Sequence, residues 1–137
     1  MISIQAVDHI GIRVVDAARA EAFYLLLGFE LVGRSGVEPV VILQNGQGVE
    51  INLIVNGASG PEPSNILMDV PEKHPGYTHV ALVVASMDET VAELGRLGIP
   101  ISGGPIRLGK GSSLFVRDPD RNVIELRARD TPGGPAI

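Results

Sequence analysis

Two histidines and one acidic residue in apolar segments are the side chains of this sequence best suited to chemistry. His9 and His79 stand 70 residues apart in similar segments, Asp8-His9-Ile10-Gly11-Ile12-Arg13-Val14 and Thr78-His79-Val80-Ala81-Leu82-Val83-Val84. Glu125 lies inside the apolar run Val123-Ile124-Glu125-Leu126, where a carboxylate without a partner is costly. Two imidazoles with one or two oxygen donors suit Zn, Ni, Mn, Co or Fe. A lone histidine in an apolar strand is usually a hydrogen-bonded core residue, but the matched pair and the acid favour a divalent metal site.

A second polar pair lies in the first half of the chain. Ile51-Asn52-Leu53 resembles Ile124-Glu125-Leu126, so Asn52 is the counterpart of Glu125 in the repeat. Glu50 precedes Asn52 by two residues, and residues i and i+2 of a strand face the same side. We therefore expect Glu50 and Asn52 to point together.

The elements that position these residues form an internal repeat. Each half predicts a β-branched strand, at 7–14 and 77–84, followed by a helix. Asp16 and Ser86 are the expected helix caps, and Gly28 and Gly98 are the expected helix stops. Three further strands are expected in each half: 29–35, 39–45 and 48–55 in the first, and 99–102, 112–117 and 122–129 in the second. The offset changes from 70 to 73 along the repeat, which predicts a longer loop at 108–113.

These elements predict an α+β protein of two tandem βαβββ units, with a curved mixed sheet around a metal-binding cavity. The first unit is expected at 1–56 and the second at 77–130. The segment 57–76 reads as a Pro/Gly-rich linker, and 131–137 as a disordered tail. A pseudo-twofold repeat would place equivalent residues face to face across a shared cavity.

The composition of the chain limits the kinds of partner that it is expected to bind. Apolar residues make up 45% and charged residues 20% of the chain, which allows an ordinary core. The net charge is −5 and no basic run occurs, so we expect no nucleic-acid partner. No apolar stretch approaches the ~20 residues that span a bilayer, and no export signal is recognised, so we expect no membrane partner and a cytoplasmic location. The absence of cysteine excludes disulfides and thiolate ligands.

Four segments carry a family pattern: Asp8-His9-Ile10-Gly11, Phe23-Tyr24-Leu25-Leu26-Leu27-Gly28-Phe29-Glu30, Tyr77-Thr78-His79-Val80-Ala81 and Phe115-Val116-Arg117-Asp118-Pro119-Asp120-Arg121-Asn122-Val123-Ile124-Glu125-Leu126. Together they resemble the vicinal oxygen chelate superfamily, which includes glyoxalase I, bleomycin-binding proteins and extradiol dioxygenases. It covers roughly residues 5–129 and is most similar in pattern to the glyoxalase-like branch. Arg121 departs from the family, whose turn usually has glycine there.

The resemblance implies a divalent metal held by His9, His79 and Glu125. The glyoxalase pattern adds a glutamate in the last strand of the first unit, where this sequence has Asn52. Asn52 can ligate through its carbonyl oxygen, or a shift of register lets Glu50 take the role. We prefer Glu50 as the catalytic acid or base, because a carboxylate can accept a proton and an amide cannot. Both alternatives remain open at this point.

Three further residues are candidates for binding the substrate. Arg13 matches an arginine that binds a substrate carboxylate in glyoxalase I, although a salt-bridged arginine at a strand end fits equally. Asn52 is a candidate for substrate binding, and so is Lys110, although a solvated loop lysine is the commoner case.

The implied function is a metal-dependent lyase, isomerase or epimerase that chelates vicinal oxygens of a small substrate and stabilises an enediolate-type intermediate. The alternatives are an extradiol-type dioxygenase and a non-catalytic protein that binds an antibiotic or metabolite. Relatives commonly form homodimers, so we expect a homodimer, with the cavity built either within one chain or across two.

Overall fold

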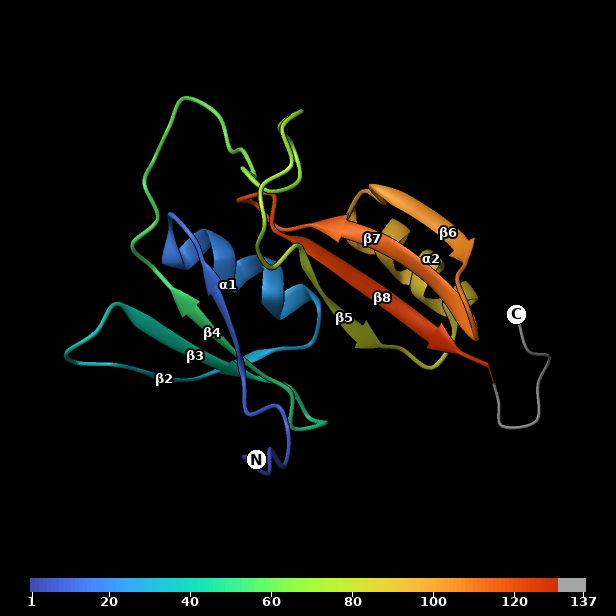
Figure 1. Ribbon diagram of the computed structural model, residues 1–137, viewed down its shortest axis with the longest axis horizontal. Helices are drawn as coiled ribbons and strands as arrows, with labels where there is room; N and C mark the ends of the chain where they lie inside the picture. Colours follow the sequence, from blue (N-terminus) through green and yellow to red (C-terminus); the bar gives the residue numbers. More distant parts are fainter. Residues whose placement is uncertain (131–137) are drawn as a thin grey trace. The chain divides into compact units, whose positions relative to one another are not determined.

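The computed structural model of the protein describes residues 1–130 (Figure 1). The tail predicted to be disordered, 131–137, lies outside the described residues. The elements of the first half are β1 (Ile10–Arg13), α1 (Ala17–Leu26), β2 (Glu30–Arg34), β3 (Val40–Gln44) and β4 (Glu50–Ile54). Those of the second half are β5 (His79–Val83), α2 (Met87–Leu97), β6 (Gly103–Arg107), β7 (Gly111–Arg117) and β8 (Val123–Arg129).

The chain divides into two compact units, which we call unit 1 (Met1–Pro63) and unit 2 (from Ser64 onwards). Each has the order βαβββ and its own four-stranded mixed sheet, β1-β4-β3-β2 in unit 1 and β5-β8-β7-β6 in unit 2. In both sheets the first and last strands of the unit are parallel neighbours, and the other pairs are antiparallel. The predicted α+β fold of two tandem βαβββ units is therefore confirmed.

Each helix begins at the predicted cap. The Asp16 side chain accepts a hydrogen bond from the backbone N–H of Arg19, and Ser86 accepts one from Glu89. These caps satisfy backbone donors that have no partner inside the helix. Gly98 ends α2 with φ at 72°, a left-handed conformation that glycine adopts without a Cβ clash. Local hydrogen bonds and backbone conformation therefore fix where the helices begin and where α2 ends.

The core of unit 1 leaves one face of β4 for polar residues. Ile51 and Leu53 of β4 are fully buried, as is Tyr24 of α1, which covers one face of its sheet (Figure 1). Because side chains alternate along a strand, Glu50 and Asn52 lie on the opposite face of β4. In this way apolar packing on one face aims the candidate residues at the other.

One prediction about unit 2 was wrong and another was wrong in part. The strand expected at 99–102 runs from Gly103 to Arg107 instead, and the loop expected at 108–113 is confined to residues 108–110, since β7 begins at Gly111. Gly111, Ser112 and Ser113 pair with β8, so the extra residues of this repeat lengthen the hairpin. A Cβ at Gly111 would stand 2.6 Å from the carbonyl oxygen of Ala128, so only glycine allows this close pairing. Pairing with β8 outweighed the low strand propensity of the local sequence.

The segment that precedes β5 is tied to the β7–β8 turn. Asp69 receives a bidentate contact from Arg121, with Nε at 2.6 Å and Nη2 at 3.0 Å, and a third contact from Arg117 Nη1 at 3.1 Å. The hydrogen bond from Arg121, together with the charges of both guanidinium groups, holds the pKa of the Asp69 carboxyl well below its usual range. This contact places residues near Asp69, inside the predicted linker, against the second sheet's hairpin.

Within residues 1–130, no helix is both long enough and apolar enough to cross a membrane.

Candidate metal centre

Unit 2 brings His79 and Glu125 together. His79 begins β5, and Glu125 lies in β8, the parallel neighbour of β5. His79 Nε2 lies 3.1 Å from Glu125 Oε1, and Glu125 is only 8% exposed. The acid that the sequence placed in an apolar strand therefore has a partner. An imidazole beside a buried carboxylate offers one nitrogen and one oxygen donor to a divalent cation.

The other ring nitrogen of His79 also has a contact. His79 Nδ1 lies 2.8 Å from Thr78 Oγ1, and the Phe115 ring packs edge-on at a centroid distance of 6.0 Å. A second contact of this kind orients a histidine ring and selects its tautomer. The ring thus presents Nε2 towards Glu125.

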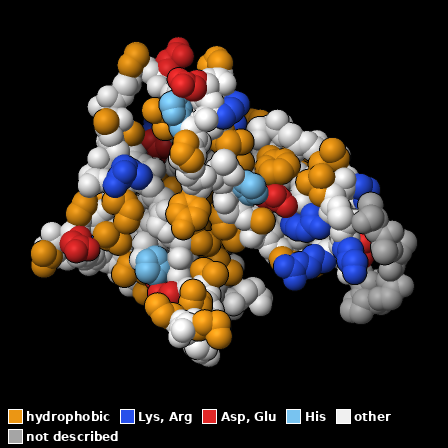
Figure 2. All heavy atoms as spheres, viewed as in Figure 1, with side chains coloured by type: hydrophobic (Ala, Val, Ile, Leu, Met, Phe, Trp, Pro, Cys, Tyr) orange, Lys and Arg blue, Asp and Glu red, His pale blue; other side chains and the backbone are white. Residues whose placement is uncertain are grey.

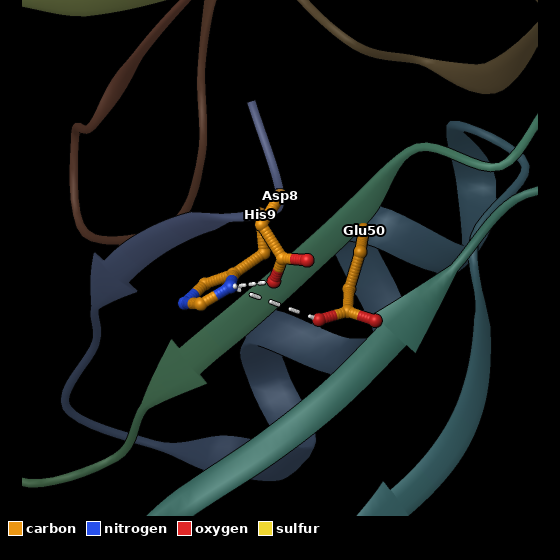
Figure 3. A group of neighbouring side chains, drawn as sticks. All are labelled: Asp8, His9 and Glu50. Atoms are coloured by element: carbon orange, nitrogen blue, oxygen red, sulfur yellow. Dashed lines mark hydrogen bonds and ion pairs between the residues drawn. The ribbon is translucent and has the colours of Figure 1, made fainter. Parts of the chain in front are cut away.

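Unit 1 gathers His9 with two carboxylates (Figure 3). His9 Nδ1 lies 2.6 Å from Asp8 Oδ2 and 4.0 Å from Glu50 Oε2. One ligand atom from each of the three residues falls within 4.8 Å of the others. Glu50 is half-buried, and its Oε1 accepts a hydrogen bond of 2.8 Å from Gln44 Nε2. This group could bind a cation or pass a proton between the carboxylates and the imidazole.

Asn52 occupies the strand position that Glu125 has in unit 2. Asn52 lies opposite Gly11 and Ile42 in its sheet, and Glu125 lies opposite Ala81 and Phe115. Asn52 Oδ1 is buried and has no hydrogen-bond partner. Buried acceptors of this kind are rare because the lost hydrogen bond to water is not replaced. A cation or a substrate donor would satisfy this oxygen.

Two of the three proposed substrate contacts, Arg13 and Lys110, have protein partners in their own units. Arg13 ends β1, and its Nε donates to Asn56 Oδ1 at 3.1 Å. Lys110 is exposed in the turn between β6 and β7, where its carbonyl oxygen accepts from the backbone N–H of Asp130. Neither lies in the His79–Glu125 pair or the group around His9.

Sequence reasoning missed three residues of these groups. Asp8 directly precedes His9, as Thr78 precedes His79, and that shared position is the signal that could have found it. Ser113 was expected in the strand 112–117 but given no role, and it contacts Glu125 through a hydrogen bond of 2.7 Å. Arg127 follows Glu125 by two residues and therefore shares its face of β8.

Comparison with known proteins identifies the family. The family model of the Glyoxalase/Bleomycin resistance protein/Dioxygenase superfamily matches residues 6–126, and the chain belongs to that superfamily. It is 31% identical to the uncharacterized protein YwkD of Bacillus subtilis (strain 168), over 90% of this chain and 96% of that protein. It is also 31% identical to the glyoxalase domain-containing protein RDO1 of Mycosarcoma maydis, over 91% of this chain and 69% of that protein. The fold is similar to that of a glyoxalase/dioxygenase from Nostoc punctiforme, with a TM-score of 0.71 at 22% identity over 96% and 99% of the two chains.

Proposed function

We propose that this protein is a divalent-metal-dependent enzyme of the glyoxalase type, a lyase, isomerase or epimerase that acts on vicinal oxygens of a small substrate. The observation that carries the proposal is the contact of the nearly buried Glu125 with His79 Nε2 at 3.1 Å. A carboxylate oxygen beside an imidazole nitrogen is a pair of donors that a divalent ion can bind. Membership of the superfamily supports the same reading.

We propose His9, His79 and Glu125 as the metal ligands. The residues present fit such an ion, because nitrogen and carboxylate donors suit Zn, Ni, Mn, Co or Fe. The unpartnered Oδ1 of Asn52 is a further oxygen donor at the strand position of Glu125. When bound, the ion supplies Lewis-acid stabilisation of negative charge on the substrate.

The chain's own residues would bind the substrate and move the proton. Glu50 is the proposed base, since its carboxylate is half-buried and lies near the His9 ring. Arg13 and Lys110 are proposed to bind anionic groups of the substrate, and Asn52 to contact its oxygens. A homodimer and a cytoplasmic location stay predictions from the sequence.

Metal analysis of two histidine variants tests the proposal. We expect about one divalent ion per chain in the purified protein, and at least a tenfold loss of metal affinity in His79→Ala, because a direct ligand is removed. His74→Ala is the matched control: His74 lies 3.7 Å from Glu72 in the segment before β5 and has no proposed role at the centre. Equal metal affinity in His79→Ala and wild type would contradict the ligand assignment.

A further inference from the structure

Glu125 is held from its second oxygen by a short chain of hydrogen bonds. Ser113, which is fully buried in β7, donates from Oγ to Glu125 Oε2 at 2.7 Å. The same Oγ accepts from Arg127 Nη1 at 3.0 Å. The directions are unambiguous because a guanidinium only donates and an ionised carboxylate only accepts. The Ser113 hydroxyl therefore links the Arg127 guanidinium to the Glu125 carboxylate.

The strands hold this chain in place. Ser113 and Arg127 lie directly opposite each other in the β7–β8 ladder, and Arg127 follows Glu125 by two residues on the same face. Arg127 is fixed at its other nitrogen, because Nη2 donates to the Leu108 carbonyl oxygen at 2.6 Å. The hairpin thus holds both Ser113, which binds Glu125 Oε2, and Arg127, which binds Ser113.

Unit 1 provides an internal comparison. The residues at the positions of Ser113 and Arg127 are Val40 and Ile54, which also lie opposite each other. Ile54 follows Asn52 by two residues, as Arg127 follows Glu125, but Asn52 Oδ1 has no hydrogen-bond partner. The repeat therefore carries the serine and arginine only where it also carries the carboxylate.

We infer that Ser113 and Arg127 are positioning residues for Glu125. Ser113 binds Oε2 and Arg127 binds Ser113, which leaves Oε1, the oxygen beside His79 Nε2, available to a metal ion. Partners of this kind fix the orientation of a ligand and typically change metal affinity by about 10–100-fold when removed. The inference rests on the proposed function, in which Glu125 is a metal ligand.

Titration with Co²⁺ alone tests this role without a substrate. Calorimetry measures the affinity, and the visible absorption of the bound ion reports its coordination. We expect Ser113→Ala and Arg127→Met each to weaken Co²⁺ binding by about tenfold or more. Arg127→Lys keeps a cationic donor and should recover part of the loss. Ser112→Ala is the matched control, because Ser112 is the neighbouring residue on the opposite face of β7 and should bind Co²⁺ as wild type does.

A double variant separates positioning from general stability. If Ser113 acts through Glu125, adding Ser113→Ala to Glu125→Ala should weaken Co²⁺ binding no further. An equal additional loss in that background would overturn the inference, as would wild-type affinity in Ser113→Ala and Arg127→Met. If Ser113→Ala does not fold, the contrast between Arg127→Met and Arg127→Lys decides. A wild-type protein that binds no Co²⁺ would instead overturn the proposed function, and this inference with it.

Discussion

At the scale of single residues, Glu50 and Asn52 share a face of β4 and differ in their surroundings. Glu50 accepts from Gln44 and lies near the His9 ring, so its carboxylate is already part of a polar group. Asn52 stands at the strand position of Glu125 with a buried oxygen that has no partner. These surroundings suit Asn52 to coordination and Glu50 to proton transfer.

The two roles predict that substitution of Glu50 lowers chiefly activity and substitution of Asn52 lowers chiefly metal affinity. Glu50→Gln keeps the shape of the side chain and removes the proton acceptor, so activity should fall by about 10²–10⁴-fold while metal affinity falls only modestly. Asn52→Ala should chiefly weaken metal binding. A screen of a glutathione hemithioacetal, 2-oxo acids and catechols would first provide a substrate. Full activity in Glu50→Gln would exclude it as the base.

At the scale of elements, the β7–β8 turn depends on Arg121 in two ways. Arg121 has a φ of 65° and is the only non-glycine residue within 1–130 with a positive φ. By the family resemblance, this position of the turn usually holds glycine. The Arg121 side chain binds Asp69 in the segment before β5. The strain of a left-handed arginine is thus offset by an ion pair that glycine could not make.

This ion pair should make stability depend on pH. Because the folded pKa of Asp69 is lowered, its contribution is present above the unfolded pKa of about 4 and is lost as pH falls further. Asp69→Asn should destabilise the protein by about 1 kcal/mol at pH 7, since exposed ion pairs contribute little and this one is bidentate. In thermal melts, the difference in melting temperature between Asp69→Asn and wild type should become smaller below pH 4.

Glu72→Gln is the control for this measurement. Glu72 belongs to the same segment and is 84% exposed in its side chain, so its substitution should leave the melting temperature nearly unchanged. If Asp69→Asn lowers the melting temperature equally at pH 3 and pH 7, the charge of Asp69 does not account for its contribution to stability.

At the scale of the whole molecule, apolar side chains remain at the surface, as the face drawn in Figure 2 shows. Ile2, Ile4 and Val7 of the N-terminal segment are among the most exposed large apolar residues. Apolar surface of this kind is commonly covered by a partner. A second copy of the chain is the partner that the family resemblance predicts.

Light scattering at micromolar concentration measures the assembly directly. We expect a mass of twice the 14.4 kDa of the single chain. Dilution should lower the mass only when the concentration approaches the dissociation constant. A mass near 14.4 kDa throughout would exclude the homodimer.

The sequence by itself determined the two βαβββ units, because its signals are local. Helix caps at Asp16 and Ser86, the stop at Gly98 and the alternation around Asn52 and Glu125 need no distant contact to be recognised. The repeat offset then aligned the candidate residues of the two halves. The ligand roles of His9, His79 and Glu125 stay predictions.

Only the tertiary structure decided what surrounds those residues. Ser113 was expected in a strand, at the edge of a Gly- and Ser-containing stretch, but only the pairing with β8 makes it a buried donor to Glu125. Asp69 contacts the β7–β8 hairpin through Arg117 and Arg121, and Arg121 lies 52 residues later in the chain. Hydrogen bonds between residues far apart leave no periodic signal in a single sequence, because their geometry exists only once the strands have paired.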